Sequence, residues 1–253
     1  MKKIISVILT FVLIAALCTV CASAELKTCQ NGKLIMATNA AFPPYEFISD
    51  EDGETIVGVD AEIAGLIAEK LGLELQIEDI EFASIVSGVQ QGKFDIGMAG
   101  MTVTEERLQN VDFSSTYAQG VQSIIVPEGS DIKTADDLAG HKIGVQESTT
   151  GHIYCEDDFG EENVTAFSTG ANAVEALKKG KVECVVIDNN PAKAFVEANE
   201  GLVLLDTSYT EEDYAICTSK ENPELTKAID EALVELIEDG SVQAVLDKYI
   251  SAE

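Results

Sequence analysis

The chain has 253 residues, 46% of them hydrophobic, which is enough for one large or two small α/β lobes. It carries 16 Lys and Arg against 45 Asp and Glu, a formal net charge of −29. Binding to nucleic acid or anionic lipid begins with Lys and Arg neutralising phosphates, so this charge argues against both as partners. We therefore expect a protein that stays soluble outside the cell and has no nucleic-acid partner.

The first two dozen residues have the pattern of an export signal. Lys2 and Lys3 form a short basic segment, residues 4–17 are almost wholly apolar, and the small residues Ala22-Ser23-Ala24 follow. This order is typical of a secretory signal peptide, which predicts cleavage after residue 24 and a location in the periplasm or at the outer cell surface. The apolar core is shorter than the roughly 20 residues that a membrane anchor needs.

The cysteines leave two questions open. Bacterial lipoproteins are cut just before a Cys, but Leu17 before Cys18 and Val20 before Cys21 are poor fits, so a lipid anchor is the minor alternative. Export permits disulfides, and the sequence does not choose a pairing among the four remaining thiols, Cys29, Cys155, Cys184 and Cys217. Their spacings do not match metal sites and the chain has 2 His, so we expect neither zinc nor any other cofactor.

Strand and helix patterns alternate along the whole chain after residue 33. The expected strands are 34–38, 73–77, 95–99, 142–145, 183–187 and 202–205. The expected helices are 58–71, 82–91, one from about 149, 172–179, 191–198, 223–238 and 242–250. Such alternation predicts an α/β protein with mainly parallel sheets covered by helices.

A faint internal repeat suggests two similar lobes. Residues 89–96 and 177–184 both have the pattern of a helix, a Gly-Lys turn and a strand. Joints of this kind are common, so the repeat alone is weak support.

An aromatic loop follows the first strand. Residues 38–47 contain two consecutive prolines and the rings of Phe42, Tyr45 and Phe47. One of these rings is placed to form a pocket wall, most readily Phe42; the alternative is that all three pack into the core.

A second segment, residues 99–107, is suited to an anion. Gly100 lets a ligand approach the backbone, and Thr102 with Glu105 fits a capping box at a helix start. The N–H groups and positive dipole end of a helix start attract anions. Arg107, the only Arg in the chain, has a planar fork that can hold a carboxylate. The alternative is an exposed Arg107 that pairs with a neighbouring acid (Glu105, Glu106 or Asp112).

A third segment, residues 187–191, places Asp188 at the end of an apolar strand, where a carboxylate can meet a buried cation. A helix N-cap formed by Asp188, Asn189 or Asn190 is the competing interpretation. Residues 146–151 add another strand-to-helix turn with free N–H groups.

Taken together, these segments resemble the polar amino-acid-binding proteins of bacterial ABC importers, the bacterial solute-binding protein family 3. The resemblance covers nearly all of the chain after the signal peptide, and its markers are residues 42–47, 58–60, 92–95, 101–107, 111–114, 137–140 and 240–241. It implies a type II periplasmic-binding-protein-like fold, two lobes joined by two crossover strands that close by hinge motion. Lobe 1 is then 25–117 with 214–253, lobe 2 is 118–213, and the hinges are 117–120 and 212–214.

The resemblance also implies site roles. Arg107 corresponds to the clamp for the ligand α-carboxylate, helped by Thr102 and by the N–H of Thr150 or Thr149. Asp188 corresponds to the partner of the α-ammonium, helped by the carbonyl of Gly100. Phe42 and Phe82 correspond to the rings that enclose the ligand side chain. The full set of expected ligand-binding residues is Asn39, Phe42, Phe82, Ala99, Gly100, Thr102, Arg107, Thr149, Thr150 and Asp188.

One departure from the family bears on the ligand. Many members that bind Lys, Arg, His or Gln carry Asp where Asn39 stands. Asn39 has no charge for a cationic side chain, and its amide both donates and accepts hydrogen bonds. We expect a neutral, polar, glutamine-like ligand, unless Glu147 faces the pocket and restores a negative charge.

The expected function is capture of a free amino acid by a monomeric, non-catalytic protein that delivers it to an ABC transporter permease. An enzyme such as a cyclohexadienyl dehydratase, which resembles this family, is one alternative, but His141 and His152 have no evident catalytic partner. A ligand-sensing protein that reports to a receptor is the other.

Overall fold

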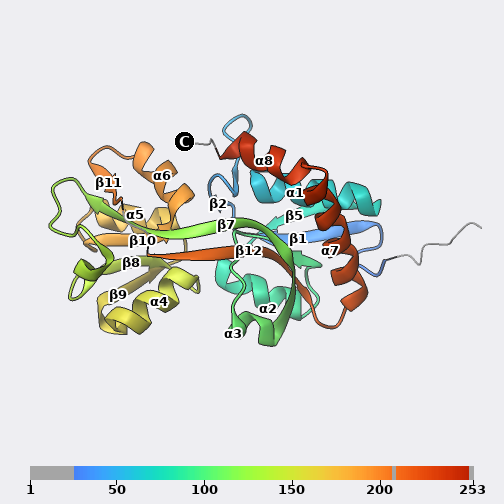
Figure 1. Cartoon of the computed structure of the whole chain (residues 1–253), viewed down its shortest axis with the longest axis horizontal. Coiled ribbons are helices and arrows are strands. Elements are labelled where there is room, and N and C mark those ends of the chain that lie inside the picture. Colours follow the sequence, from blue (N-terminus) through green and yellow to red (C-terminus); the bar gives the residue numbers. More distant parts are fainter. Residues whose placement is uncertain (1–25, 207–208, 251–253) are drawn as a thin grey trace, which may run out of the picture.

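The computed structural model describes residues 26–206 and 209–250, which form layered α/β units (Figure 1). The expected signal peptide, residues 1–24, lies outside the described residues, and so do Cys18 and Cys21 within it. Within the described ranges, no helix has the length and apolar character needed to cross a membrane.

Nine strands form one mixed sheet. Its order is β5 (Glu74–Asp79), β1 (Lys33–Thr38), β6 (Ile96–Gly97), β12 (Thr210–Ser219), β7 (Val111–Pro127), β10 (Cys184–Asp188), β8 (Ile143–Gln146) and β9 (Val164–Phe167), with β11 (Leu202–Leu204) beside β7. The pairs β1–β5, β1–β6, β10–β8 and β8–β9 are parallel, as the sequence predicts. A small second sheet consists of β2 (Ala41–Phe42), β3 (Glu46–Ile48) and β4 (Ile56–Val57).

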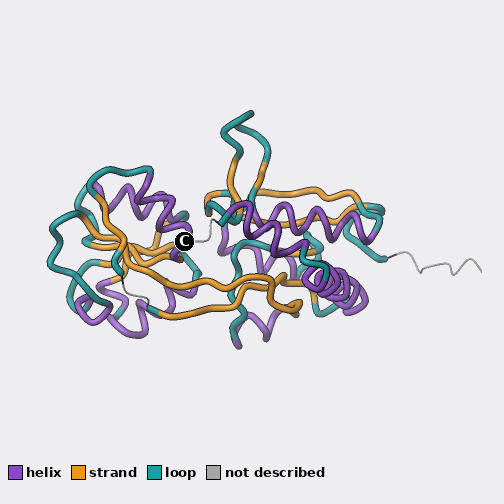
Figure 2. The backbone as a smooth tube through the Cα atoms, turned by 45° about the horizontal axis from the view of Figure 1, so that its top comes forward, coloured by secondary structure: helices purple, strands orange, loops and turns teal. Residues whose placement is uncertain are grey.

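Two long antiparallel strands join the halves of the molecule. β7 and β12 pair from Thr210 opposite Gln122 to Ser219 opposite Val111, with irregular register between Tyr214 and Cys217. They run side by side from one half into the other in both views (Figures 1 and 2). We call the half with β1–β6 the first lobe and the half with β8–β11 the second lobe. The lobe boundaries at 117/118 and 213/214 fall within these strands and stay a prediction.

Helices cover both faces of the first lobe. α1 (Val59–Leu71), α7 (Pro223–Glu238) and α8 (Ser241–Tyr249) pack on one face, and α2 (Ile85–Gln90) and α3 (Glu105–Asn110) pack on the other (Figure 1). The apolar side chains of α1 recur every four residues, and Val59, Ile63 and Ile67 are fully buried. The expected helix at 82–91 is a 3-10 turn, Phe82–Ser84, that continues into α2.

The second lobe is also three-layered. α5 (Gly170–Lys178) and α6 (Asn189–Glu197) cover one face, and α4 (Thr150–Phe159) covers the other (Figure 1). Short 3-10 turns lie at Ala135–Leu138 and Glu161–Asn163. Cys155 and Cys184 are buried in the core under α4, and all four described cysteines are free thiols.

The internal repeat corresponds to one local structure used twice. Gly92 after α2 and Gly180 after α5 both have φ in the left-handed region, +68° and +65°. The N–H of the Lys that follows each of them donates to a carbonyl of the preceding helix, at 3.0 Å for Lys93 and 2.9 Å for Lys181. Each turn is the helix-ending motif that favours glycine, and each leads into a strand beside the pocket.

One helix start was predicted wrongly. The capping box of Thr102 and Glu105 does not form: α3 begins at Glu105, and its N-cap is Thr104, whose Oγ1 accepts from the N–H of Arg107 at 3.1 Å. Thr102 instead forms a β-bridge with Tyr214, which holds it in extended backbone. Arg107 nevertheless lies in the first turn, as expected.

Candidate ligand-binding site

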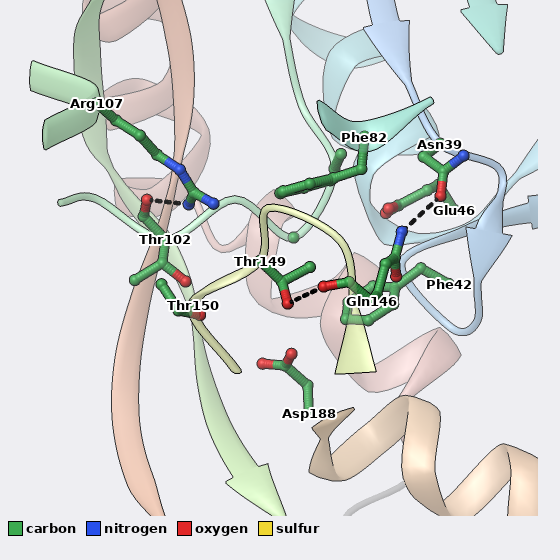
Figure 3. A pocket seen from close by; sticks show the side chains of 12 residues that line it. Asn39, Phe42, Glu46, Phe82, Thr102, Arg107, Gln146, Thr149, Thr150 and Asp188 are labelled. Carbon is green, nitrogen blue, oxygen red and sulfur yellow. Dashed lines mark hydrogen bonds between the residues drawn. The ribbon is translucent and has the colours of Figure 1, made fainter. Parts of the chain in front are cut away.

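A pocket of about 320 Å³ lies where the two lobes meet (Figure 3). All ten residues that the sequence analysis named line it, and Glu46 and Gln146 line it as well. The twelve lining residues are Asn39, Phe42, Glu46, Phe82, Ala99, Gly100, Thr102, Arg107, Gln146, Thr149, Thr150 and Asp188. They come from both lobes, so the pocket exists only where the lobes face each other.

Arg107 is a buried cation without an anion. It is 8% exposed, and its guanidinium donates to the carbonyls of Thr102 (2.7 Å) and Ser148 (3.1 Å). No carboxylate forms an ion pair with it anywhere in residues 26–206 and 209–250; the neighbouring Asp112 pairs with Lys220 instead. Burial lowers the pKa of Arg107, which reflects the cost of a desolvated charge. The alternative of an exposed, locally paired Arg is therefore wrong.

The guanidinium of Arg107 also lies over the ring of Phe82, with 5.3 Å from Cζ to the ring centroid. Such a stack holds the planar fork in one orientation. Two carbonyls and one ring thus position the group while leaving its charge uncompensated.

Asp188 is a buried carboxylate tied to both crossover strands. It accepts from Nε2 of Gln122 on β7 at 2.9 Å and from the hydroxyl of Tyr214 on β12. It occupies the N-cap position of α6 but makes no capping hydrogen bond, so the N-cap interpretation is wrong for its side chain. Burial, together with the nearby Glu212 carboxylate, raises the pKa of Asp188 to about 7.

The apolar walls are the rings of Phe42 and Phe82, which are 7% and 9% exposed. The other two rings of the aromatic loop have structural roles. Tyr45 is buried against Tyr214 and accepts from Asn190 at 3.0 Å, and Phe47 packs edge-on against Tyr249. Only Phe42 of the three rings lines the pocket, the one for which the sequence most favoured that place.

Asn39 and Gln146 meet across the lobes. Nε2 of Gln146 donates to Oδ1 of Asn39 at 2.9 Å, and Nδ2 of Asn39 donates to the carbonyl of Ile80 at 2.9 Å. Gln146 was missed as a site residue, although it begins the strand-to-helix turn that the sequence marked. Glu147 is exposed and does not line the pocket, so it adds no charge there.

The N-terminus of α4 completes the rim of the pocket. Thr149 is the N-cap: its Oγ1 accepts from the N–H of His152 at 3.3 Å and donates to the carbonyl of Gln146 at 2.8 Å. Thr150 is the first helical residue and is buried. Both line the pocket, so the geometry supports either as a carboxylate donor, with the positive end of α4 behind them.

Glu46 was also missed. It is the first residue of β3, it is 1% exposed, and its carboxyl is hydrogen-bonded to the Asp60 carboxyl. Burial and the facing Asp60 carboxyl raise the pKa of Glu46 well above its usual range. Glu46 lies within residues 42–47, a marker of the family resemblance, but a Glu after Tyr45 in a loop does not show which way its side chain points.

Comparison with known proteins gives one consistent result. The family model for bacterial extracellular solute-binding proteins, family 3, matches residues 34–252. The arginine-binding extracellular protein ArtP of Bacillus subtilis (strain 168) is 30% identical over 229 residues, 87% of each chain. The glutamine-binding protein GlnH of the same organism is 30% identical over 227 residues, 88% of this chain and 83% of GlnH.

Solved structures agree on the fold. An ancestral arginine-binding protein bound to glutamine superposes with a TM-score of 0.83 at 36% identity, covering 88% of this chain and 100% of that one. The arginine-, lysine-, histidine-binding protein ArtJ from Geobacillus stearothermophilus gives 0.82 at 33% identity, covering 87% and 96%. These relatives bind amino acids and are not enzymes. The chain is therefore a member of the bacterial extracellular solute-binding proteins, family 3, the amino-acid-binding components of ABC transporters.

Proposed function

We propose that this protein captures a free amino acid with a neutral polar side chain, glutamine being the type, between its lobes and delivers it to an ABC transporter permease. The observation that carries the proposal is Arg107, a buried guanidinium with two carbonyl partners and no anion, facing a pocket that also holds Asp188. An α-carboxylate supplies the missing anion, and an α-ammonium supplies a cation for Asp188.

The division of these two residues between the lobes links binding to shape. Arg107 belongs to α3 of the first lobe and Asp188 to the end of β10 in the second. Burying either charge of a zwitterion unpaired costs several kcal/mol, so only lobes in contact satisfy both ends at once. A permease then distinguishes the loaded protein from the empty one by the angle between the lobes.

Support for a neutral side chain comes from the end of the pocket away from Arg107. Asn39 and Gln146 present amides there, and Glu147 turns to solvent. Similar proteins are named for arginine, cystine, histidine and glutamine, most often for arginine, and one arginine-binding protein was solved with glutamine bound, so the names do not determine the side chain. The amide at position 39 favours glutamine over arginine.

A thermal-shift panel of the twenty amino acids tests the proposal. Ligand at 100 times its dissociation constant adds roughly 2.7 kcal/mol of stability. For a chain of this size that corresponds to a rise of about 5–10 °C in Tm. A rise with one or a few neutral polar amino acids is the expected result. A folded protein that responds to none refutes amino-acid capture, and a larger response to arginine than to glutamine refutes the neutral ligand.

A further inference from the structure

A strained backbone position lies beside the ligand pocket. Ser148, in the turn between β8 and α4, has a φ of +63° and is the one non-glycine residue of the described ranges in the left-handed region. A side chain at such a position costs free energy, because its Cβ crowds the following carbonyl oxygen. A residue stays there where the surrounding structure holds it.

The turn itself holds Ser148 only loosely. It is closed by the N–H of Thr149, which donates to the carbonyl of Gln146 at 3.4 Å, a long hydrogen bond. Ser148 is the third residue of this turn, the place where a turn that needs positive φ favours glycine. Further contacts are therefore needed to keep a serine in this conformation.

The carbonyl of Ser148 has a partner in the other lobe. It accepts from a guanidinium nitrogen of Arg107 at 3.1 Å, and Arg107 belongs to α3 of the first lobe. The second carbonyl partner of the guanidinium, that of Thr102 at 2.7 Å, lies in the first lobe itself. The Ser148 carbonyl thus connects the second lobe to the residue that we assign to the ligand α-carboxylate.

The N–H of Ser148 is held by a histidine in the first turn of α4. It donates to Nδ1 of His152 at 3.1 Å. A ring nitrogen that accepts a hydrogen bond carries no proton, so the imidazole is neutral and its proton is on Nε2. Nε2 lies 3.0 Å from Oε1 of Glu156, which suits that proton, and the His152 side chain is 19% exposed.

These two bonds of Ser148 differ in what lobe movement does to them. The bond to His152 lies within the second lobe and is kept when the lobes separate, whereas the bond to Arg107 crosses between the lobes and forms on closure. A carbonyl that is already oriented loses little freedom when the lobes close, so more of the binding free energy is retained as affinity.

We propose that His152 is a positioning residue for amino-acid capture, which holds Ser148 in the left-handed conformation through Nδ1 so that the Ser148 carbonyl meets Arg107 on closure. His152 does not line the ligand pocket. It lines a neighbouring groove of about 880 Å³ that shares Phe82 and Arg107 with the pocket. The inference rests on the proposed function and adds a residue outside the pocket that controls affinity.

Titration calorimetry with glutamine at pH 8, above the pKa of Asp188 of about 7, tests the acceptor role of His152. His152→Ala removes the acceptor and should weaken binding at least about tenfold, or 1.4 kcal/mol. His152→Asn carries an oxygen on Cγ where imidazole carries Nδ1, so it can accept from Ser148 and should bind within about threefold of wild type. Because this variant has no Nε2, its recovery assigns the effect to the acceptor and not to the Glu156 contact.

A glycine at position 148 tests the route through the backbone. Glycine adopts positive φ readily, so in a Ser148→Gly background His152→Ala should weaken binding by less than about threefold. A loss of tenfold or more in that background overturns the route through Ser148.

The other histidine provides a matched control. His141 is also in the second lobe and also contacts a carboxylate, with 3.2 Å from its Nδ1 to Oε1 of Glu183, but it lines neither the pocket nor the groove. His141→Ala should leave the glutamine affinity within about threefold of wild type.

Nitrogen NMR of the imidazole in the ligand-free protein checks the local bond without any ligand. We expect Nδ1 of His152 to carry no proton and Nε2 to carry one. If no amino acid binds the wild type while this pattern is found, the proposed function fails and the support of Ser148 by His152 stands.

The remaining outcomes concern His152 alone. If glutamine binds and His152→Ala binds it within threefold of wild type, or His152→Asn binds it as weakly as His152→Ala, capture stands and His152 has no positioning role. Should His152→Ala not fold, the wild type decides: a proton on Nδ1 at pH 8 overturns the inference.

Discussion

Nε2 of Gln146 donates to Oδ1 of Asn39 at 2.9 Å, a hydrogen bond from the second lobe to the first at the far end of the pocket. Two further cross-lobe bonds join Arg107 to the Ser148 carbonyl and Asn190 to the Tyr45 hydroxyl. Asn39 therefore lines the pocket with its amide and also takes part in a hydrogen bond between the lobes.

Asn39→Asp should shift the ligand preference toward cations. The substitution places a negative charge at the side-chain end and removes the N–H that Asn39 donates to the Ile80 carbonyl. We expect the arginine-to-glutamine affinity ratio to rise by at least about tenfold, which corresponds to about 1.4 kcal/mol, since an opposite charge added in a buried site contributes at least that much. Titration calorimetry measures both affinities; a ratio that stays within threefold of wild type would show that position 39 does not control side-chain charge.

Binding should weaken on acidification because of Asp188. In the ligand-free protein its pKa is raised to about 7, and an α-ammonium binds the ionised form, so the pKa must fall in the complex. Affinity is then full above pH 7 and falls by up to about tenfold for each pH unit below it. Calorimetry at pH 5, 6, 7 and 8 should show this trend, with protons released on binding near pH 6.

Asp188→Asn should bind weakly at every pH and lose that trend, because it has no proton to give up. An affinity of the wild type that is constant from pH 5 to 8 would contradict the role of Asp188 as the ammonium partner.

Gly120→Ala should displace Asp188 and the Tyr214 hydroxyl that donates to it. A Cβ on Gly120 of β7 would lie 2.2 Å from the Tyr214 hydroxyl and 2.7 Å from Oδ1 of Asp188. Moving these groups should weaken binding at least about tenfold and destabilise the protein by about 1–3 kcal/mol. Denaturant unfolding and calorimetry measure the two effects.

Gly65→Ala is the matched control for that substitution. The nearest atom to a Cβ on Gly65 in α1 is Cδ2 of Leu75 at 4.0 Å, which is ordinary contact. Alanine there should stabilise the helix by about 0.5–1 kcal/mol and leave affinity unchanged. Equal effects of the two variants would show that Gly120 has no special place beside Asp188.

Much of the fold could be predicted because its elements follow simple patterns. Buried residues four apart define α1, and α7 begins at Pro223 and ends at Glu238 as expected. The Gly-Lys turns after α2 and α5 are readable from glycine alone. The start of α3 was misplaced because a tertiary contact, the bridge between Thr102 and Tyr214, overrides a local capping signal.

Some residues of the site could be predicted from local sequence, and others depend on tertiary structure. Arg107 and Asp188 lie at a helix start and a strand end, where local sequence already places chemistry at the pocket. Glu46 and Gln146 have no such local marker: the first depends on how β3 orients its side chain, and the second on a partner 107 residues away. The hydrogen bonds of Gln122 and Tyr214 to Asp188 depend on the register of the crossover strands, which sequence pattern does not give.

The most direct test uses ligands that lack one α-group. Titration calorimetry should compare the best-bound amino acid with its α-carboxamide, on the wild type and on Arg107→Ala. If Arg107 is the carboxylate partner, the carboxamide should bind the wild type at least about 100-fold more weakly, or 2.7 kcal/mol. Arg107→Ala should bind the parent amino acid more weakly by the same factor, and its thermal unfolding should show that it is still folded. Binding of the carboxamide within tenfold of the parent, or retention of the parent by Arg107→Ala, would contradict the assignment of Arg107.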